Sequence, residues 1–201
     1  MINTGVDDVT RRWTLRLVVG LAAGAVLLSG CSGQQEANDT LPGADATPSA
    51  SEAELPPLGP PDLPMPAEAR TQDAAGAEAF VRYYIDLINR TSTVMDAAPL
   101  REFSKQCAEC NRIASNTEKA AASGRRFRDG EISVIQMGMP LLDGRTAQLA
   151  MRVNQDRFVV LDASDSPVEG GSEAYDDVPG GVALEWDSSR TTWSMTQLTF
   201  G

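Results

Sequence analysis

The chain has 201 residues, which is enough for one domain with additional segments. It carries 17 basic and 28 acidic residues and no histidine, so its formal net charge is −11. An acidic surface repels nucleic acid and anionic lipid headgroups, and we expect any charged partner to be cationic. Without histidine, Ser-His-Asp and Cys-His catalysis are excluded and the commonest metal ligand is missing.

The first 30 residues have the order of a bacterial lipoprotein signal peptide. Basic residues Arg11, Arg12 and Arg16 precede an apolar run over residues 17–28 that is too short for a comfortable membrane span. The Leu-Ser-Gly-Cys sequence that ends at Cys31 resembles the lipobox of bacterial lipoproteins. The sequence therefore predicts cleavage after residue 30 and lipidation of Cys31. Two or more acyl chains, palmitate among them, would then hold the protein at the extracytoplasmic face of the cell membrane. The adjacent arginines leave both the general secretory route and the twin-arginine route open.

Residues 31–66 are predicted to form a disordered tether behind the lipidated cysteine. Positions 32–66 hold eight of the twelve prolines and six acidic residues, with no basic residue among them. Such a segment buries too little apolar surface to offset its ordering entropy. The folded domain is therefore expected over residues 67–201.

The first part of this domain has the pattern of helices. From Ala74 onward, apolar residues recur at three- and four-residue spacing and predict a long amphipathic helix. Its apolar face comprises Ala77, Phe80, Val81, Tyr84, Leu87, Ile88, Thr91 and Met95. The opposite, solvent face carries charges four residues apart at Glu78, Arg82, Asp86 and Arg90. Two further helices are expected, over residues 99–103 with Asp96 as a cap, and over 109–122 with Gly124 as the stop.

The rest of the chain alternates in the manner of strands. We expect strands near residues 132–135, 147–153, 157–162, 182–186 and 191–200. Helices followed by an antiparallel sheet indicate an α+β domain, in which the long helix packs on a curved sheet. This arrangement looks like the open-ended cone of NTF2-like and cystatin-like folds, which host many functions. The acidic segment 165–177 is expected to be a solvated, mobile loop that can act as a lid over the open end.

Three motifs carry a closer family resemblance. They are Gly-Ala-x-Ala-Phe-Val-Arg-Tyr-Tyr-Ile-Asp-Leu-x-Asn at residues 76–89, Cys107-x-x-Cys110, and Leu184-x-Trp186. Together with the lipobox, they resemble a family of actinobacterial lipoproteins of unknown function over residues 64–200. The resemblance implies a lipoprotein with these domain limits, and it implies no substrate.

Once Cys31 is lipidated, Cys107 and Cys110 remain as a pair in an oxidising compartment, and we predict a disulfide between them. Its expected role is to fix the turn into the third helix. The alternative is a thiol–disulfide oxidoreductase. It is disfavoured because the pair follows a helical stretch and encloses Glu109, whose charge opposes a thiolate. A tetrahedral zinc site would need more soft ligands, so no metal and no cofactor is expected.

Tyr84 stands out within the apolar face because its ring suits burial while its hydroxyl needs a partner. It could line a pocket with Phe80 and Trp186, or it could be a core tyrosine bonded to backbone. Trp193 has a similar ambiguity and could be exposed. With no catalytic constellation in the sequence, we expect a non-catalytic binding or interaction module of the cell envelope, whose partner is an envelope protein or a small ligand. The alternatives are a small enzyme that uses the pocket and a thiol–disulfide protein at Cys107 and Cys110.

Overall fold

The computed structural model describes residues 55–201. The predicted signal peptide, the lipidation site at Cys31 and most of the predicted tether lie outside the described residues. After a 3-10 turn, η1 (Ala67–Arg70), come helices α1 (Ala74–Val94), α2 (Ala98–Glu102) and α3 (Ala108–Ala122). Eight strands follow: β1 (Arg126–Asp129), β2 (Ile132–Met137), β3 (Leu141–Asp143), β4 (Thr146–Gln155), β5 (Phe158–Leu161), β6 (Pro167–Ser172), β7 (Tyr175–Asp187) and β8 (Thr192–Phe200). Within the described range, no helix combines the length and apolar character that crossing a membrane requires.

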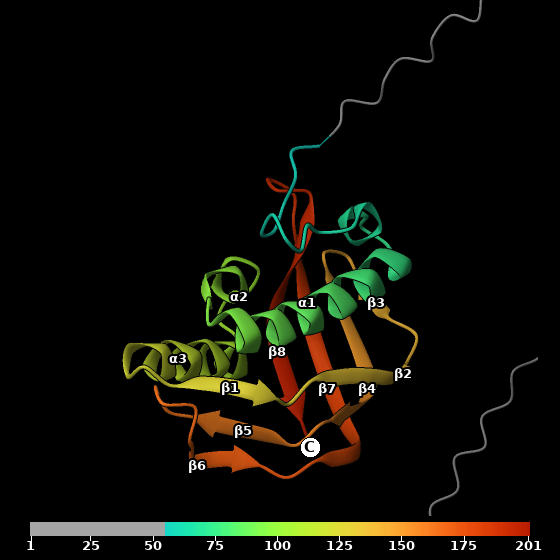
Figure 1. The fold of residues 1–201 in the computed structure, drawn as a ribbon. Helices are drawn as coiled ribbons and strands as arrows, with labels where there is room; N and C mark the ends of the chain where they lie inside the picture. Colours follow the sequence, from blue (N-terminus) through green and yellow to red (C-terminus); the bar gives the residue numbers. More distant parts are fainter. Residues whose placement is uncertain (1–54) are drawn as a thin grey trace, which may run out of the picture. The chain divides into compact units, whose positions relative to one another are not determined.

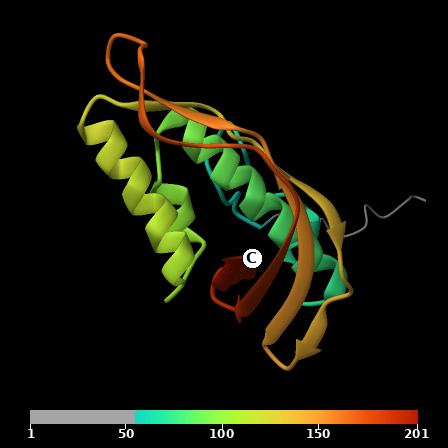
Figure 2. The same ribbon diagram turned by 90° about the horizontal axis from the view of Figure 1, so that it is seen from below.

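The strands form two antiparallel sheets. The larger has the order β2-β4-β7-β8, with β3 also paired to β4, and the smaller has the order β1-β5-β6. Helix α1 lies across the strands of the larger sheet (Figure 1), and the strands curve around it (Figure 2). The structure thus confirms the predicted α+β fold, with helices first and antiparallel strands after them.

Helix α1 forms where its sequence predicts. Asp73 caps the N-terminus by accepting a hydrogen bond from the Gly76 backbone N–H at 2.7 Å. Met95 ends the helix in the left-handed conformation, with φ 60°. Its predicted apolar face is buried from Ala77 to Thr91, and only Met95 at the end is partly exposed.

The core lies between α1 and the larger sheet. Alternate side chains of β4, β7 and β8 point toward the helix and are buried, as the period-two pattern predicts. They include Ala147, Leu149, Met151, Val153, Val182, Leu184, Trp186, Trp193 and Met195. The two tryptophan rings meet edge to face, with centroids 5.2 Å apart.

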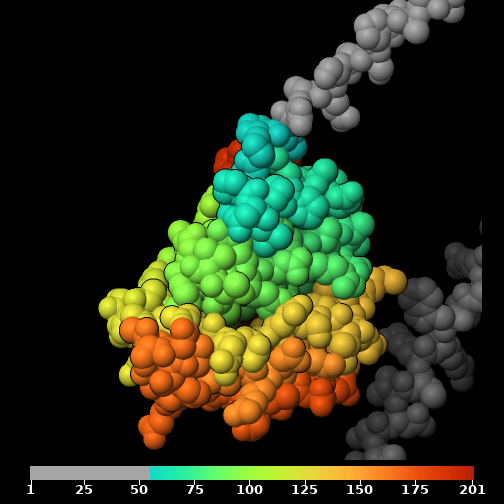
Figure 3. Space-filling model, viewed as in Figure 1, coloured from blue at the N-terminus to red at the C-terminus, as the bar shows by residue number. Residues whose placement is uncertain are grey.

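A strap over residues 55–66 differs from the disordered tether that the composition predicts. Leu58 and Leu63 pack against the core, and Met65 is only 8% exposed. The strap is further held by two hydrogen-bonded contacts, at 2.8 and 2.9 Å, between the Arg90 guanidinium and the Asp62 carboxylate. Arg90, which the sequence places on the solvent face of the helix, therefore binds the strap instead. In the space-filling view, the strap lies on the surface above α1 (Figure 3). Residues 55–66 therefore belong to the folded domain, because the spaced apolar side chains of this proline-rich segment pack against the core.

The prediction of a mobile acidic loop over residues 165–177 is wrong. Strand β6 and the start of β7 occupy this segment, pairing Val168 with Val160 and Tyr175 with Gln155. Arg152 also forms an ion pair with Asp177. Backbone pairing and this ion pair give the segment a fixed place that its acidic composition does not reveal.

Candidate functional site

The three residues expected to line a pocket do not form one together. Phe80 and Tyr84 are fully buried, and the Tyr84 hydroxyl donates a hydrogen bond to the Leu100 carbonyl at 3.0 Å. Burial raises the pKa of Tyr84 to about 12. Tyr84 is thus the backbone-bonded core tyrosine of the second interpretation.

The two tryptophans are also structural. Trp186 is 6% exposed, and it borders a small polar depression at one end of the sheet. Trp193 is fully buried, so the expectation that it could be exposed is wrong. Its indole Nε1–H donates to the Thr71 carbonyl at 2.9 Å, which satisfies the one polar group that it buries.

A different hollow, which we call the helix–sheet cleft, opens between α1, α3 and the ends of both sheets. It has a volume of about 170 Å³. Its apolar lining comes from both helices and from four strands, and comprises Ile88, Ile113, Phe127, Ile132, Phe158 and Phe200. A hollow is therefore present between the helices and the sheets, but its lining differs from the three residues that the sequence suggested.

Aromatic side chains dominate one wall of the cleft. The rings of Phe127 and Phe158 pack edge to face, with centroids 5.6 Å apart. Gly130 connects β1 to β2 with a φ of 88°, and a Cβ at this position would lie 2.4 Å from the Phe158 Cβ. Only glycine allows the chain to turn this close to the ring.

A second hollow of about 150 Å³ adjoins the first and shares Ile132, Gln155 and Phe200 with it. Tyr175 and Val178 of β7 provide another part of its wall. The acidic segment predicted to be a lid thus contributes a fixed strand to the site.

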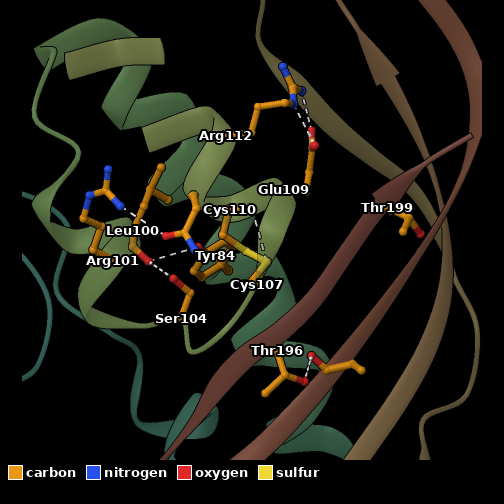
Figure 4. Close-up of a disulfide and its surroundings, with 12 residues drawn as sticks. Tyr84, Leu100, Arg101, Ser104, Cys107, Glu109, Cys110, Arg112, Thr196 and Thr199 are labelled. Atoms are coloured by element: carbon orange, nitrogen blue, oxygen red, sulfur yellow. Dashed lines mark hydrogen bonds and ion pairs between the residues drawn. A yellow bond between two sulfur atoms is a disulfide. The ribbon is translucent and has the colours of Figure 1, made fainter. Parts of the chain in front are cut away.

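Polar side chains line the cleft as well, among them Ser92 and Thr117, whose hydroxyls donate to carbonyls of their own helices. Asn116 of α3 and Gln155 of β4 contribute side-chain amides. At the rim, the Arg112 guanidinium donates to the Glu109 carboxylate (Figure 4), and this hydrogen bond raises the pKa of Arg112. Asp129 adds a second rim carboxylate. A hollow that combines an aromatic and aliphatic wall with polar groups that can orient a ligand is typical of a small-molecule binding site. No group of three potential metal ligands occurs among residues 55–201.

A family model covers residues 51–199. The chain belongs to the family of unknown function DUF6318. The family assignment confirms the predicted membership of a family without a known function. The match begins at residue 51, in agreement with a domain that includes the strap. No curated protein sequence matches the chain.

The DUF6318 domain is also similar to several solved structures. The intermembrane space region of the chloroplast protein ARC6 has 12% identity and a TM-score of 0.48, covering 65% of this chain and 97% of that one. An NTF2-like superfamily protein from Salmonella enterica has 9% identity and a TM-score of 0.42, covering 64% and 92%. A domain of unknown function with a cystatin-like fold from Nostoc punctiforme has 19% identity and a TM-score of 0.33, covering 65% and 76%.

In the DUF6318 domain, the predicted disulfide is present at the start of α3 (Figure 4). The sulfurs of Cys107 and Cys110 are 2.00 Å apart, and Cys107 is the N-cap of the helix. The pair therefore follows α2 and occupies the N-terminus of α3, in agreement with its expected place at the turn into the third helix. Both cysteines are only 1% exposed, whereas redox-active thiols are accessible to their partners. The bond fixes the first turn of α3, which holds Glu109 at the rim of the cleft.

Proposed function

We propose that this protein is a lipid-anchored, extracytoplasmic and non-catalytic binding module, and that its helix–sheet cleft takes a small apolar ligand. The proposal rests on the cleft itself, which has an aromatic and aliphatic wall. A second, smaller hollow adjoins the cleft and shares three lining residues with it. Small-molecule sites combine such an apolar wall with polar groups that orient the ligand. The rim carries two carboxylates and one guanidinium, which favours a neutral or cationic ligand over an anionic one.

The proposed location depends on the N-terminal sequence. A basic stretch, a short apolar run and a lipobox occur in the order required for export and for acylation of Cys31. Feeding labelled palmitate to the producing cells tests this step. We expect label in the wild-type protein and none in Cys31→Ala, and equal labelling of both would contradict anchoring at this cysteine.

Ligand binding can be tested with the neutral fluorescent probe N-phenylnaphthylamine, which brightens on entering apolar sites. Asn116 lies on α3 at the cleft, and Asn116→Trp places an indole where the ligand would lie. Ala121→Trp is the matched control, because Ala121 is an exposed residue of the same helix that does not line the cleft. We expect Asn116→Trp to weaken probe binding about tenfold, equivalent to about 1.4 kcal/mol, and Ala121→Trp to leave it unchanged.

Equal probe affinity in the wild type and in both variants would contradict binding in the cleft. The melting temperature of each variant controls for damage to the fold. Both Asn116 and Ala121 are exposed, so we expect the two substitutions to change stability little.

The two alternatives receive less support. A small enzyme with Tyr84 as a working group would need that hydroxyl at the ligand, but it bonds to Leu100 inside the core. A thiol–disulfide protein would need an accessible sulfur, and Cys107 and Cys110 are buried. Insulin reduction by the reduced protein is the measurement that would revive the second alternative.

A further inference from the structure

An apolar segment lies at the surface where β2 passes into β3. Residues 137–142 read Met-Gly-Met-Pro-Leu-Leu, without a charged, hydroxyl or amide side chain. Met139 is 85% exposed, Leu141 is 72% exposed and Leu142 is 45% exposed. We call residues 137–142 the apolar edge. A run of exposed apolar residues is unfavourable in water, and contiguous apolar surface of this kind marks a site that contacts a protein or a membrane.

The apolar edge projects its side chains in two opposite directions. Strand β3 is at the border of the larger sheet and pairs only with β4. Leu141 is in register with the exposed Gln148, and Leu142 is in register with the buried Ala147. Because successive side chains of a strand point to opposite faces, the two leucines lie on opposite faces of the sheet. Fluid lipid can surround such a projecting edge, whereas one rigid protein surface covers only one of its faces.

The strap begins at the same end of the domain. The Arg70 guanidinium donates to the Pro56 carbonyl at 2.6 Å and so fixes the start of the strap beside η1. Figure 1 shows η1 and the start of the strap together at one end of the domain. Two residues after Arg70, the Gln72 amide donates at 3.3 Å to the carbonyl of Gly144, in the turn that follows β3. The chain that leads back to Cys31 therefore joins the domain at the end where the apolar edge lies.

We infer that the apolar edge dips into the membrane surface that carries the lipid anchor. The inference rests on the proposed acylation of Cys31. Residues 32–54 connect Cys31 to the strap and span at most about 80 Å even when fully extended, so the anchor keeps the domain near the bilayer. Tethering makes the contact intramolecular, and a contact of low affinity then suffices. The edge carries no charge, so it avoids the repulsion that the acidic surface of the chain would meet at anionic head groups.

This contact would turn the helix–sheet cleft away from the membrane. Strand β3 pairs with the start of β4, from Thr146 to Gln148, whereas Gln155 at the end of β4 lines the cleft. At about 3.3 Å per residue, Thr146 and Gln155 are about 30 Å apart along the strand. The cleft would thus open toward the aqueous side, from which a ligand can enter it.

Nitroxide quenching in vesicles tests the contact. The full acylated chain is purified with Leu141→Cys, labelled there with an NBD fluorophore and reconstituted in phosphatidylethanolamine–phosphatidylglycerol vesicles that contain nitroxide-labelled phosphatidylcholine. The matched control is Val94→Cys, because Val94 is 50% exposed at the end of α1, outside the edge. We expect the label at position 141 to lose most of its fluorescence and the label at position 94 to lose little. Equal loss at both positions, or loss at neither, would overturn the inference.

A charged substitution beside the label gives a second readout. With the fluorophore on Leu142→Cys, Leu141→Glu should restore most of the quenched fluorescence, and Val94→Glu should not. Unchanged quenching in Leu141→Glu, or a reducible dimer of Leu141→Cys without quenching, would overturn the inference, and the dimer would assign the edge to a second copy. Wild-type chain that stays on the vesicles while position 141 is unquenched contradicts only the lipid contact of the edge. Chain that leaves the vesicles contradicts the proposed anchor as well.

Discussion

The Leu100 carbonyl provides a sharp test of how the core is held together. It lies inside the core and accepts two hydroxyl hydrogen bonds, from Tyr84 at 3.0 Å and from Ser104 at 2.7 Å. Tyr84→Phe removes one of these donors but keeps the ring. Because Ser104 still satisfies the carbonyl, we expect the free energy of unfolding to fall by about 0.5–1.5 kcal/mol. Ser104→Ala should lower the free energy of unfolding by a similar amount.

The double variant should lose more free energy of unfolding than the two single variants lose together. With both hydroxyls gone, the Leu100 carbonyl is buried without a side-chain donor, and an unpaired buried acceptor costs about 1–3 kcal/mol. We therefore expect a coupling free energy between Tyr84 and Ser104 of about 1 kcal/mol. Urea unfolding, followed by the fluorescence of the buried Trp186 and Trp193, measures the free energy of unfolding. It is applied to the wild type, the two single variants and the double variant. Additive single effects, or a Tyr84→Phe variant as stable as the wild type, would refute the reasoning.

The pKa of Tyr84 gives the same residue a pH signature. Its folded-state pKa of about 12 exceeds the ordinary value of 10.0, because burial favours the neutral phenol. The stability that follows from this shift is fully present below pH 10.0 and is lost as the pH rises toward 12. The wild type should therefore lose more stability than Tyr84→Phe over this alkaline range.

Three further predictions concern other parts of the domain. Replacing Cys107 and Cys110 by serine should lower the free energy of unfolding by about 2 kcal/mol, the loop-entropy value for so short a loop, as measured by urea unfolding. Gly130→Ala should destabilise the domain by about 1–3 kcal/mol, because the residue has a positive φ and its Cβ would meet Phe158; an unchanged melting temperature would contradict this. The Arg90 hydrogen bonds lower the pKa of Asp62, so their stabilisation of the strap is present above the ordinary carboxyl pKa and is lost as the pH falls through the lowered value. Hydrogen exchange of the strap should therefore accelerate in acid, and Asp62→Asn should show the faster exchange already at neutral pH.

Local sequence patterns suffice to predict several elements of this protein. The three- and four-residue spacing from Ala77 to Thr91 identifies α1, and the alternation from Ala147 to Val153 identifies β4. The Cys107–Cys110 spacing indicates the disulfide, and the region before Cys31 predicts export and lipidation. Each of these signals lies within a short stretch of chain, because helical and strand periodicity follow from backbone geometry.

Which side chains line the cleft and which fill the core depends on how distant segments pack together. Phe127, Phe158 and Phe200 come from three separate strands, and no local pattern connects them before the sheets form. Tyr84 was ambiguous because the acceptor of its hydroxyl, Leu100, lies 16 residues away on another helix. The strap, too, looks disordered by composition, and only the assembled core gives its spaced apolar side chains a place to be buried. A site assembled from distant segments is a property of packing, which composition and periodicity do not encode.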